Sequence, residues 1–249
     1  MKFTIVTICY NAENTIEKTM CSVLSQTFDD YEYLIQDGAS TDATVAKIDS
    51  VIDRYSELKD RIKVVSASDD GLYNAMNKAV ERALGDYIIF MNSGDVFEDS
   101  EVLKKVASEM LKTESADIFY GNVIRIKPVG EILEKYKGKN PLLKLLLTGN
   151  IPSHQSTFVK TEVMKEMRFD ESYKITADFD FYVRAYSQKK MIVYMPDIIV
   201  SKVDNIEGVS SEADNLEKMR VEDDRSLRKN IPFWYYLIKI PKEIYRRLL

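Results

Sequence analysis

Apolar, β-branched segments alternate with amphipathic segments through the first part of the chain. The apolar segments predict four buried strands, at 3–9, 31–36, 62–66 and 87–91. The amphipathic segments between them predict three helices, of which the first begins at an Asn14 cap with Glu17 three residues on and the third ends at Gly85. Strands joined by helices of this length form a parallel sheet with right-handed crossovers and helices on both faces.

The alternation is less regular after residue 99. A Ser100 cap predicts a helix at 101–112, and the segment 127–150, which contains prolines and glycines, predicts a loop or short helix near a binding face. The remaining predicted elements are strands at 117–126, 157–160 and 191–195 and a helix at 178–188. We therefore expect an α/β fold whose mostly parallel, mixed sheet is flanked by helices.

The composition excludes several classes of protein. The 249 residues carry a net charge of −5 and are 45% hydrophobic, so the chain can bury a sizeable core but lacks the basic field of a protein that binds nucleic acid. Its two cysteines, Cys9 and Cys21, can build neither a disulfide framework nor a zinc cluster. Because the sequence shows neither a signal-peptide pattern nor an apolar run long enough to cross a bilayer, we expect a protein of the cytoplasm.

Polar side chains follow the predicted strands at the edge where α/β sheets bind their ligands. At the end of the first strand, Tyr10 can stack on a planar base and Asn11 can hydrogen-bond a polar ligand. Asp37 ends the second strand, where it can accept the ring N–H of a nucleobase, and Asp69 follows the third. Each is also an ordinary turn residue, but side chains that end successive parallel strands face one crevice.

The segment Asn92-Ser93-Gly94-Asp95 follows the fourth strand and brings one carboxylate to the same edge. It is either a simple turn or the place where Asp95 holds a divalent cation, Mn²⁺ or Mg²⁺, against a diphosphate. No Gly-x-Gly-x-x-Gly follows the first strand, and Gly-x-x-x-x-Gly-Lys is absent. With acids where such loops would be, we expect a metal to bridge the protein carboxylate and the phosphate oxygens.

Five segments together resemble successive blocks of the family 2 glycosyltransferases, in the order that this family keeps. They are Thr4–Glu13, Ser22–Thr27, Gln36–Thr44, Asp70–Lys78 and Met91–Asp95. A later segment, Thr176–Arg184, resembles the acceptor-side block of the family, which usually reads Thr-Glu-Asp or Glu-Asp before an aromatic helix. The resemblance extends to about residue 200 and leaves the rest of the chain unmatched.

This resemblance implies a GT-A (Rossmann-like) fold, a nucleotide-diphosphate sugar donor, a divalent metal and inversion at the anomeric carbon. It places Tyr10 and Asp37 at the base and ribose of the donor and Asp69 in the nucleoside pocket. The segment from Asn92, through Ser93, to Asp95 stands where the family has its Asp-x-Asp metal motif, and Asp178 is the expected catalytic base.

We accordingly expect a GT-A catalytic domain at 1–205 and a C-terminal helical extension at 206–249. Within the catalytic domain, residues 1–99 are the expected nucleotide-sugar-binding half and residues 100–205 the acceptor half. The sequence says nothing of the oligomeric state.

Two residues depart from the family's pattern. Asn92 replaces the first Asp of the metal motif, which bears on metal affinity, and Ala177 replaces the Glu of the acceptor block, which leaves the base Asp178 intact. An inverting transfer needs one carboxylate that removes the proton of the acceptor hydroxyl, and such a base contributes about 10²–10⁴-fold. Asp180 is expected to be structural instead, as a partner for Arg184 four residues on in the helix.

His154 is the only histidine and precedes the predicted strand at 157–160. A lone histidine is usually structural or exposed, but histidine also binds metals and phosphate groups. Because Asn92 stands in place of an acid, we include His154 with Asp95 as a candidate metal ligand.

The C-terminal part of the sequence contains a charged segment, 207–229, that predicts a solvated helix, and then an apolar, aromatic segment, 231–238. Behind it come four basic residues, Lys239, Lys242, Arg246 and Arg247. Aromatics followed by clustered bases suit a membrane interface, and a helix that docks on the catalytic domain or on a second subunit suits them equally. We expect 231–249 to contact the inner face of a bacterial membrane peripherally, where a lipid-linked acceptor would lie.

The sequence thus predicts an inverting glycosyltransferase of cell-surface polysaccharide synthesis, with a UDP-sugar as the first-choice donor and a glycan or lipid-linked saccharide hydroxyl as the acceptor. Two alternatives stay open. A non-catalytic nucleotide-sugar-binding or scaffold protein is compatible with Asn92 and Ala177. A sugar nucleotidyltransferase should show a Gly-rich, basic loop after the first strand, and Tyr10–Glu13 is neither.

Overall fold

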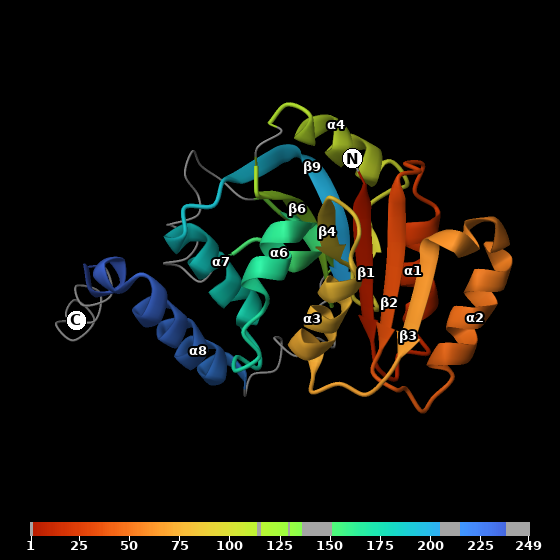
Figure 1. Cartoon of the computed structure of the whole chain (residues 1–249), viewed down its shortest axis with the longest axis horizontal. Coiled ribbons are helices and arrows are strands. Elements are labelled where there is room, and N and C mark those ends of the chain that lie inside the picture. The colour runs from red at the N-terminus through yellow and green to blue at the C-terminus, as the bar shows by residue number, and fades with distance from the viewer. Residues whose placement is uncertain (1, 114–115, 129, 136–150, 205–214, 238–249) are drawn as a thin grey trace. The chain divides into compact units, whose positions relative to one another are not determined.

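The computed structural model describes residues 2–113, 116–128, 130–135, 151–204 and 215–237 (Figure 1). These residues divide into two compact units, which are described separately below. The first unit draws on the ranges 1–136, 152–168 and 191–207, and the second on 137–151, 169–190 and 208–249. The division of the chain at residue 205 into a catalytic domain and an extension stays a prediction.

The first unit is built on one large sheet. Its strands are β1 (Phe3–Cys9), β2 (Tyr31–Asp37), β3 (Ile62–Ser66), β4 (Tyr87–Phe90), β5 (Val96–Phe97), β6 (Ile118–Lys127), β7 (Gly130–Glu134), β8 (Thr157–Lys160) and β9 (Ile192–Asp204). They follow the order β3-β2-β1-β4-β8-β6-β9-β5, with β7 paired to β6. The pairs among β1 to β4 are parallel, as is β6 with β9, while β8 is antiparallel to both its neighbours. The predicted mixed, mostly parallel sheet is confirmed.

Helices cover both faces of this sheet (Figure 1). They are α1 (Ile16–Leu24), α2 (Thr44–Arg54), α3 (Leu72–Arg82), α4 (Val102–Met110) and α6 (Thr161–Met167), with short 3₁₀ turns η1 (Ser56–Arg61) and η2 (His154–Ser156). Apolar residues of α1, α2 and α4 share one core with Ile5, Tyr33 and Ile89. The intervening residues of β1 and β2 face the other way, where α3 contacts both strands.

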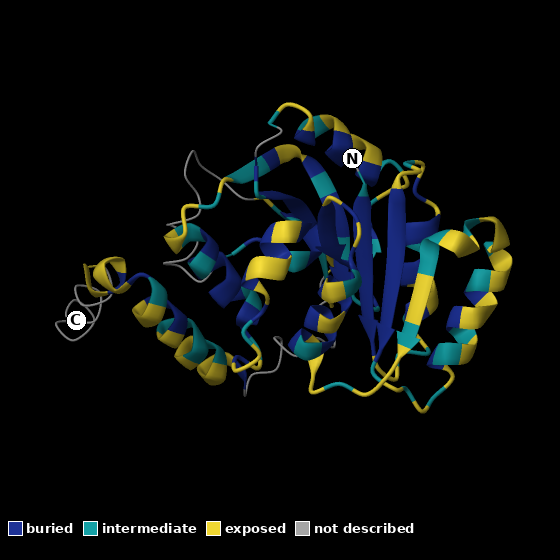
Figure 2. Cartoon of the chain, viewed as in Figure 1, coloured by how far each residue is buried: buried dark blue, intermediate teal, exposed yellow. Residues whose placement is uncertain are grey.

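Burial on both faces explains why the first strands read as continuous apolar runs rather than alternating ones. Figure 2 shows β1 and β2 buried along their whole length, whereas β3, at the edge of the sheet, is more exposed. The order β3-β2-β1-β4 places the reversal of strand order between β1 and β4. Ligands of α/β sheets bind outside the carboxyl ends of the strands at such a point.

The second unit contains the helices α7 (Ala177–Ser187) and α8 (Asn215–Asn230), and residues 232–237 are also helical. The predicted helix at 207–229 is therefore confirmed from Asn215 onward, and its earlier residues lie outside the described residues. None of the helices in the described part of the chain has the length and apolar character of a membrane span.

Two predicted helix caps are wrong. The first helix has Thr15 rather than Asn14 at its N-cap, and the Thr15 hydroxyl hydrogen-bonds the Ser93 hydroxyl at 2.9 Å. The helix predicted after Ser100 begins at Val102 instead, because the carboxylate of Asp99 accepts the backbone N–H of Glu101 at 2.8 Å and holds the turn before it. For α4 the oxygen comes from a residue close by in sequence, whereas the Thr15 hydroxyl contacts a distant loop and makes no capping hydrogen bond to α1.

The second half of the sheet differs from its prediction in two places. Residues 130–134, predicted to lie in a loop or short helix, form β7, because their backbone pairs with β6. Of the same predicted segment, Lys127 ends β6, and residues 136–150 lie outside the described residues. The last strand does not end at Met195 but continues beyond Pro196. The amide of Asn122 makes this possible, since its Nδ2 donates to the carbonyl oxygens of Pro196 at 2.8 Å and Ile198 at 3.1 Å where the ladder is irregular.

Candidate active site

The loops after β1, β2 and β3 meet around Gly38. A Cβ atom at this position would lie 2.9 Å from Asp69 Oδ2 and 3.3 Å from Tyr10 Cδ2, so a glycine is what allows the two side chains to approach. Asp69 is held by the backbone N–H of Gly71, which donates to its Oδ1 at 2.9 Å. The ring of Tyr10 is 65% exposed and therefore open to stacking.

Asn11 supports the same group of loops. Its φ of 46° lies in the left-handed region that asparagine tolerates better than most residues. Its backbone N–H donates to the Ser40 hydroxyl at 2.8 Å, and its side-chain Oδ1 accepts the N–H of Thr41 at 2.9 Å. The side chain thus ties the end of β1 to the loop after β2, and a hydrogen bond from Asn11 to a ligand stays a prediction.

Asp37 is completely buried at the end of β2. Its Oδ2 accepts the backbone N–H of Ser40 at 3.0 Å and the hydroxyl of Ser66 at 2.6 Å, and its Oδ1 accepts the Ser40 hydroxyl. Burial, and then the nearby Asp37 carboxylate, raise the pKa of the Cys9 thiol to about 12, so this thiol stays protonated. The structure therefore gives Asp37 a clear part in holding the loops together.

The segment after β4 faces a second polar segment, in η2. The Asn92 side-chain nitrogen Nδ2 lies 3.1 Å from His154 Nε2, while the other end of the amide, Oδ1, is buried without a hydrogen-bond partner among the described residues. Exchanging the two ends of the amide would change which atom contacts the imidazole but would still leave one end unsatisfied. Buried unsatisfied polar atoms are rare and call for a missing partner.

Asp95 and His154 are connected through neighbouring residues. The Gln155 side-chain Nε2 donates to Asp95 Oδ2 at 3.0 Å, and Asp95 is 5% exposed. Sequence reasoning missed Gln155, although its position beside His154 in the same short turn was a usable signal. Together with the Asn92 contact, this hydrogen bond joins the end of β4 to η2 at two points.

The fit of this group of residues to a divalent cation is partial. Across the ranges that the structure covers, no cluster of three or more His, Cys, Asp or Glu side chains could hold a metal ion. The chain offers instead the carboxylate of Asp95, the imidazole of His154 and the unsatisfied amide oxygen of Asn92. Oxygen and imidazole ligands of this kind suit Mn²⁺ or Mg²⁺ only if donor phosphate and water complete the coordination.

The predicted base, Asp178, belongs to the second unit and lies in the first turn of α7. It is partly buried, and its Oδ1 accepts the N–H of Phe179 at 2.9 Å. The neighbouring acid Asp180 is completely buried and its Oδ2 accepts a hydrogen bond from Arg184 Nε at 2.6 Å. The prediction that Asp180 pairs with Arg184 at helical spacing is confirmed.

Comparison with known sequences places the chain in a family. The sequence model described as Glycosyl transferase family 2 matches residues 4–190, which is most of the chain. A PGL/p-HBAD biosynthesis glycosyltransferase of Mycobacterium bovis is 27% identical over 210 residues, covering 84% of this chain and 79% of the relative. The putative teichuronic acid biosynthesis glycosyltransferase TuaG of Bacillus subtilis is 36% identical over 118 residues, or 47% of this chain and 45% of that protein.

Solved structures show the same fold. S. aureus TarS (residues 1–349) in complex with UDP-GlcNAc matches with a TM-score of 0.73 and 21% identity, over 93% of this chain and 68% of that one. The mannosyltransferase PcManGT from Pyrobaculum calidifontis, in complex with GDP-Man and Mn²⁺, matches with a TM-score of 0.65 and 16% identity, over 93% of this chain and 64% of that one. The expected GT-A fold is confirmed.

Proposed function

Because this chain belongs to glycosyl transferase family 2 and is a glycosyltransferase, we propose that it moves a sugar from a nucleotide-diphosphate sugar to a hydroxyl of a glycan or lipid-linked saccharide. One observation carries the proposal: the loops after the four parallel strands bring an exposed aromatic ring, carboxylates and an unsatisfied amide to one edge of the sheet. An aromatic ring can stack on a base and the amide can contact a diphosphate or its cation.

The expected donor is a UDP-sugar, and the expected process is the synthesis of a cell-surface polysaccharide. Complexes of structural neighbours with UDP-GlcNAc and with GDP-Man support a nucleotide-sugar donor. Relatives named for PGL/p-HBAD and for teichuronic acid biosynthesis support an acceptor in surface glycan synthesis.

In this proposal the nucleoside lies against the loops of β1 to β3. The Tyr10 ring stacks on the base, and Asp69 beside it completes the pocket together with Asn11. Both oxygens of Asp37 already accept hydrogen bonds from protein groups. Asp37 therefore contacts the base or ribose by exchanging the hydrogen bond from the exposed Ser66 hydroxyl for one from the nucleoside of the nucleotide sugar. Asn92 and Ser93 contact the diphosphate or sugar at the end of β4.

Asp178 is the proposed general base. It removes the proton of the acceptor hydroxyl while the hydroxyl oxygen attacks the anomeric carbon and the bond from that carbon to the diphosphate oxygen breaks. The new bond forms on the face opposite the leaving nucleoside diphosphate, so the anomeric configuration inverts. A positioned base of this kind contributes about 10²–10⁴-fold.

Asp95 and His154, with the amide oxygen of Asn92, are the residues that would hold Mn²⁺ or Mg²⁺. When bound, the cation supplies charge neutralisation at the diphosphate, so that no protein acid is needed for the leaving group. In the protein itself, the hydrogen bond from Gln155 keeps Asp95 oriented. Asn92 Nδ2 contacts His154 Nε2, so this contact must open before that ring nitrogen could bind the cation.

The segment after α8 is the proposed contact with the inner face of the membrane. Residues 232–237 form a helical turn on which Phe233, Trp234, Tyr236 and Leu237 are exposed, and the basic residues at 239–247 lie outside the described residues. Exposed aromatics suit the interface between headgroups and acyl chains. Deletion from Pro232 onward should abolish binding to anionic liposomes, and unchanged binding would argue for a helix that docks on protein instead.

The proposed activity is tested with a panel of UDP-, GDP- and dTDP-sugars, each with Mn²⁺ or Mg²⁺. Thermal shift reports binding, and slow release of the nucleoside diphosphate reports cleavage of the donor. We expect one class of donor to bind both the wild type and Asp178→Asn equally, and release to fall at least about 10²-fold in the variant.

The same panel separates the alternatives. Binding without donor cleavage in both proteins favours a non-catalytic nucleotide-sugar-binding protein, which Asn92 and Ala177 are compatible with. Cleavage that is equal in wild type and Asp178→Asn removes Asp178 from the role of base.

A further inference from the structure

One carboxylate of helix α8 binds the turn 174–176, which directly precedes α7 and is the approach to that helix. Glu222 Oε1 accepts the backbone N–H of Lys174 at 2.8 Å, and its Oε2 accepts those of Ile175 at 3.1 Å and Thr176 at 2.9 Å. The Thr176 hydroxyl donates to the same Oε2 at 3.2 Å. These N–H groups precede the first helical turn, so no hydrogen bond within α7 can satisfy them.

The Glu222 carboxylate is held in its charged form. Burial alone would raise the pKa of Glu222, but the three backbone donors outweigh it and keep the pKa below the ordinary value of 4.5. Charge-assisted hydrogen bonds to a carboxylate are stronger than neutral ones. The turn 174–176 is therefore fixed to α8 at neutral pH.

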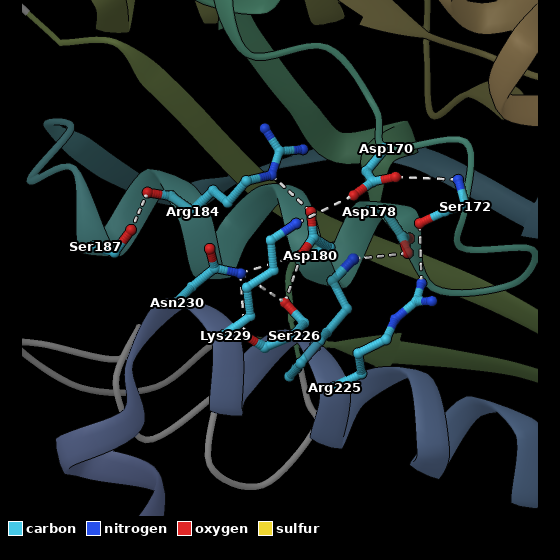
Figure 3. Close-up of polar contacts among 11 residues, drawn as sticks. Asp170, Ser172, Asp178, Asp180, Arg184, Ser187, Arg225, Ser226, Lys229 and Asn230 are labelled. Carbon is cyan, nitrogen blue, oxygen red and sulfur yellow. Dashed lines mark hydrogen bonds and ion pairs between the residues drawn. The ribbon is translucent and has the colours of Figure 1, made fainter.

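A second carboxylate, which is completely buried, joins the two helices one turn further on. Asp180 Oδ1, from α7, accepts the Ser226 hydroxyl at 2.7 Å and the Asn230 side-chain Nδ2 at 3.2 Å, both from α8 (Figure 3). Its other oxygen accepts Arg184 Nε at 2.6 Å. Because Asp180 is completely buried, its oxygens need all of these partners in place of water, and the geometry of the partners is correspondingly restricted.

Asp178 lies midway between these two anchors, two residues after Thr176 and two before Asp180. One helical turn contains about 3.6 residues, so the anchors hold little more than the single turn on which Asp178 sits. Two further contacts hold the segment before α7. Arg225 lies over the buried Tyr173 ring, 3.7 Å from its centroid. Lys229 pairs with Asp170 at 3.5 Å (Figure 3). The exposed Lys229 pair contributes little by comparison.

We propose that Glu222 and Asp180 are positioning residues, which dock α8 on the start of α7 and thereby fix the turn that presents Asp178 to the acceptor hydroxyl. The inference rests on the proposed function, in which Asp178 is the base. A base must stand within hydrogen-bond reach of the proton that it removes. Misplacing reacting groups by about 1 Å costs up to about 10²-fold in rate.

Glu222→Gln in the full chain tests this, because it removes the charge while nearly keeping the shape. The matched control is Glu217→Gln, the same change at an exposed position of the same helix. Two measurements apply: hydrogen exchange of the backbone amides at 174–180, and kcat and KM for release of UDP from the UDP-sugar that the wild type cleaves fastest. Asp180→Asn serves as a second variant, with its folded fraction checked by thermal unfolding.

We expect Glu222→Gln to speed the exchange of the amides at 174–176 at least about tenfold and to lower kcat about 10- to 100-fold, with KM for the donor unchanged. Glu217→Gln should match the wild type in both. If Glu222 only stabilised the fold, Glu222→Gln would lower the folded fraction, and it would not lower kcat of the folded protein while leaving KM unchanged. Wild-type exchange and wild-type kcat in Glu222→Gln would overturn the inference.

The design also separates this inference from the proposed function. If Asp178→Asn retains full donor cleavage, the assignment of the base fails whatever Glu222→Gln does. If Asp178→Asn loses cleavage while Glu222→Gln keeps it, only the positioning role fails. Because hydrogen exchange needs no turnover, unchanged exchange at 174–176 in Glu222→Gln rejects the docking itself even when no donor is cleaved.

Discussion

The loops after β2 and β4 bring polar side chains to the same edge of the sheet, but these side chains differ in whether protein hydrogen bonds satisfy them. After β2, Asp37 is completely buried and both its oxygens accept hydrogen bonds from Ser40 and Ser66. After β4, one end of the Asn92 amide contacts His154 and the other has no partner among the described residues. Filled acceptors stabilise a loop, whereas an unsatisfied buried atom marks a place where a ligand can bind.

The largest effect is expected on the β4 side. Asp95→Ala removes the only carboxylate of the segment 92–95, and we expect donor cleavage to fall about 10³-fold, because the diphosphate loses several kcal/mol of charge stabilisation. Release of UDP from a UDP-sugar in the presence of Mn²⁺ measures this. Turnover close to the wild-type rate would show that the segment after β4 does not act on the donor diphosphate.

On the β2 side the expected effect is on stability. Asp37→Ala leaves the Ser40 N–H and two hydroxyls without their acceptor, so we expect the free energy of unfolding to fall by about 2–4 kcal/mol. Urea unfolding measures it. Asp70→Ala, at an exposed position after β3, is the control and should stay within about 0.5 kcal/mol of the wild type. Equal losses in the two variants would contradict a structural role for Asp37.

A smaller change should strengthen the β4 site rather than weaken it. Asn92→Asp supplies a second carboxylate beside Asp95, and added ligand charge tightens binding of hard cations, so we expect about tenfold less Mn²⁺ to give half-maximal donor cleavage. A titration of activity against Mn²⁺ concentration measures the shift. An unchanged or higher Mn²⁺ requirement would show that Asn92 does not face the cation.

The smallest effect concerns acid stability and involves Glu32, at the opposite end of β2 from Asp37. Burial alone would raise the pKa of Glu32, but hydrogen bonds from Thr4 and the Leu84 N–H, and then Lys63, hold the pKa below the ordinary 4.5. A lowered folded-state pKa contributes stability that is present above about pH 4.5 and is lost as the pH falls through the folded value. Thermal unfolding should therefore show a shallower loss of Tm at acid pH in Glu32→Gln than in the wild type; identical slopes would contradict it.

Part of the fold follows from local pattern. The apolar runs that predict strands at 62–66 and 157–160 end where β3 and β8 end, because each is bounded by polar or turn residues. The two-residue strand β5 is too short to give any periodicity, and α6 follows β8 without a turn signal. The continuation of β9 past Pro196 depends on the side chain of Asn122 in β6, a strand that is far away in sequence, so no local pattern predicts it.

The candidate site was predictable only in part. Asp37, Asp95 and Asp178 could be located at strand and helix ends from the sequence, but the hydrogen bonds that separate a structural carboxylate from an available one come from other loops. The carboxylate that holds the approach to Asp178 shows this most clearly. Glu222 lies 46 residues from Thr176 along the chain. It belongs to a charged helix, and nothing in the sequence pattern of that helix sets Glu222 apart from the other charged residues.

Calorimetric titration of UDP, with and without Mn²⁺, into the wild type and Asp95→Asn tests most directly whether the end of β4 holds the donor diphosphate. We expect Mn²⁺ to tighten UDP binding to the wild type by about tenfold or more, and Asp95→Asn to bind UDP as the metal-free wild type does, with or without Mn²⁺. The same Mn²⁺-dependent tightening in Asp95→Asn would contradict it.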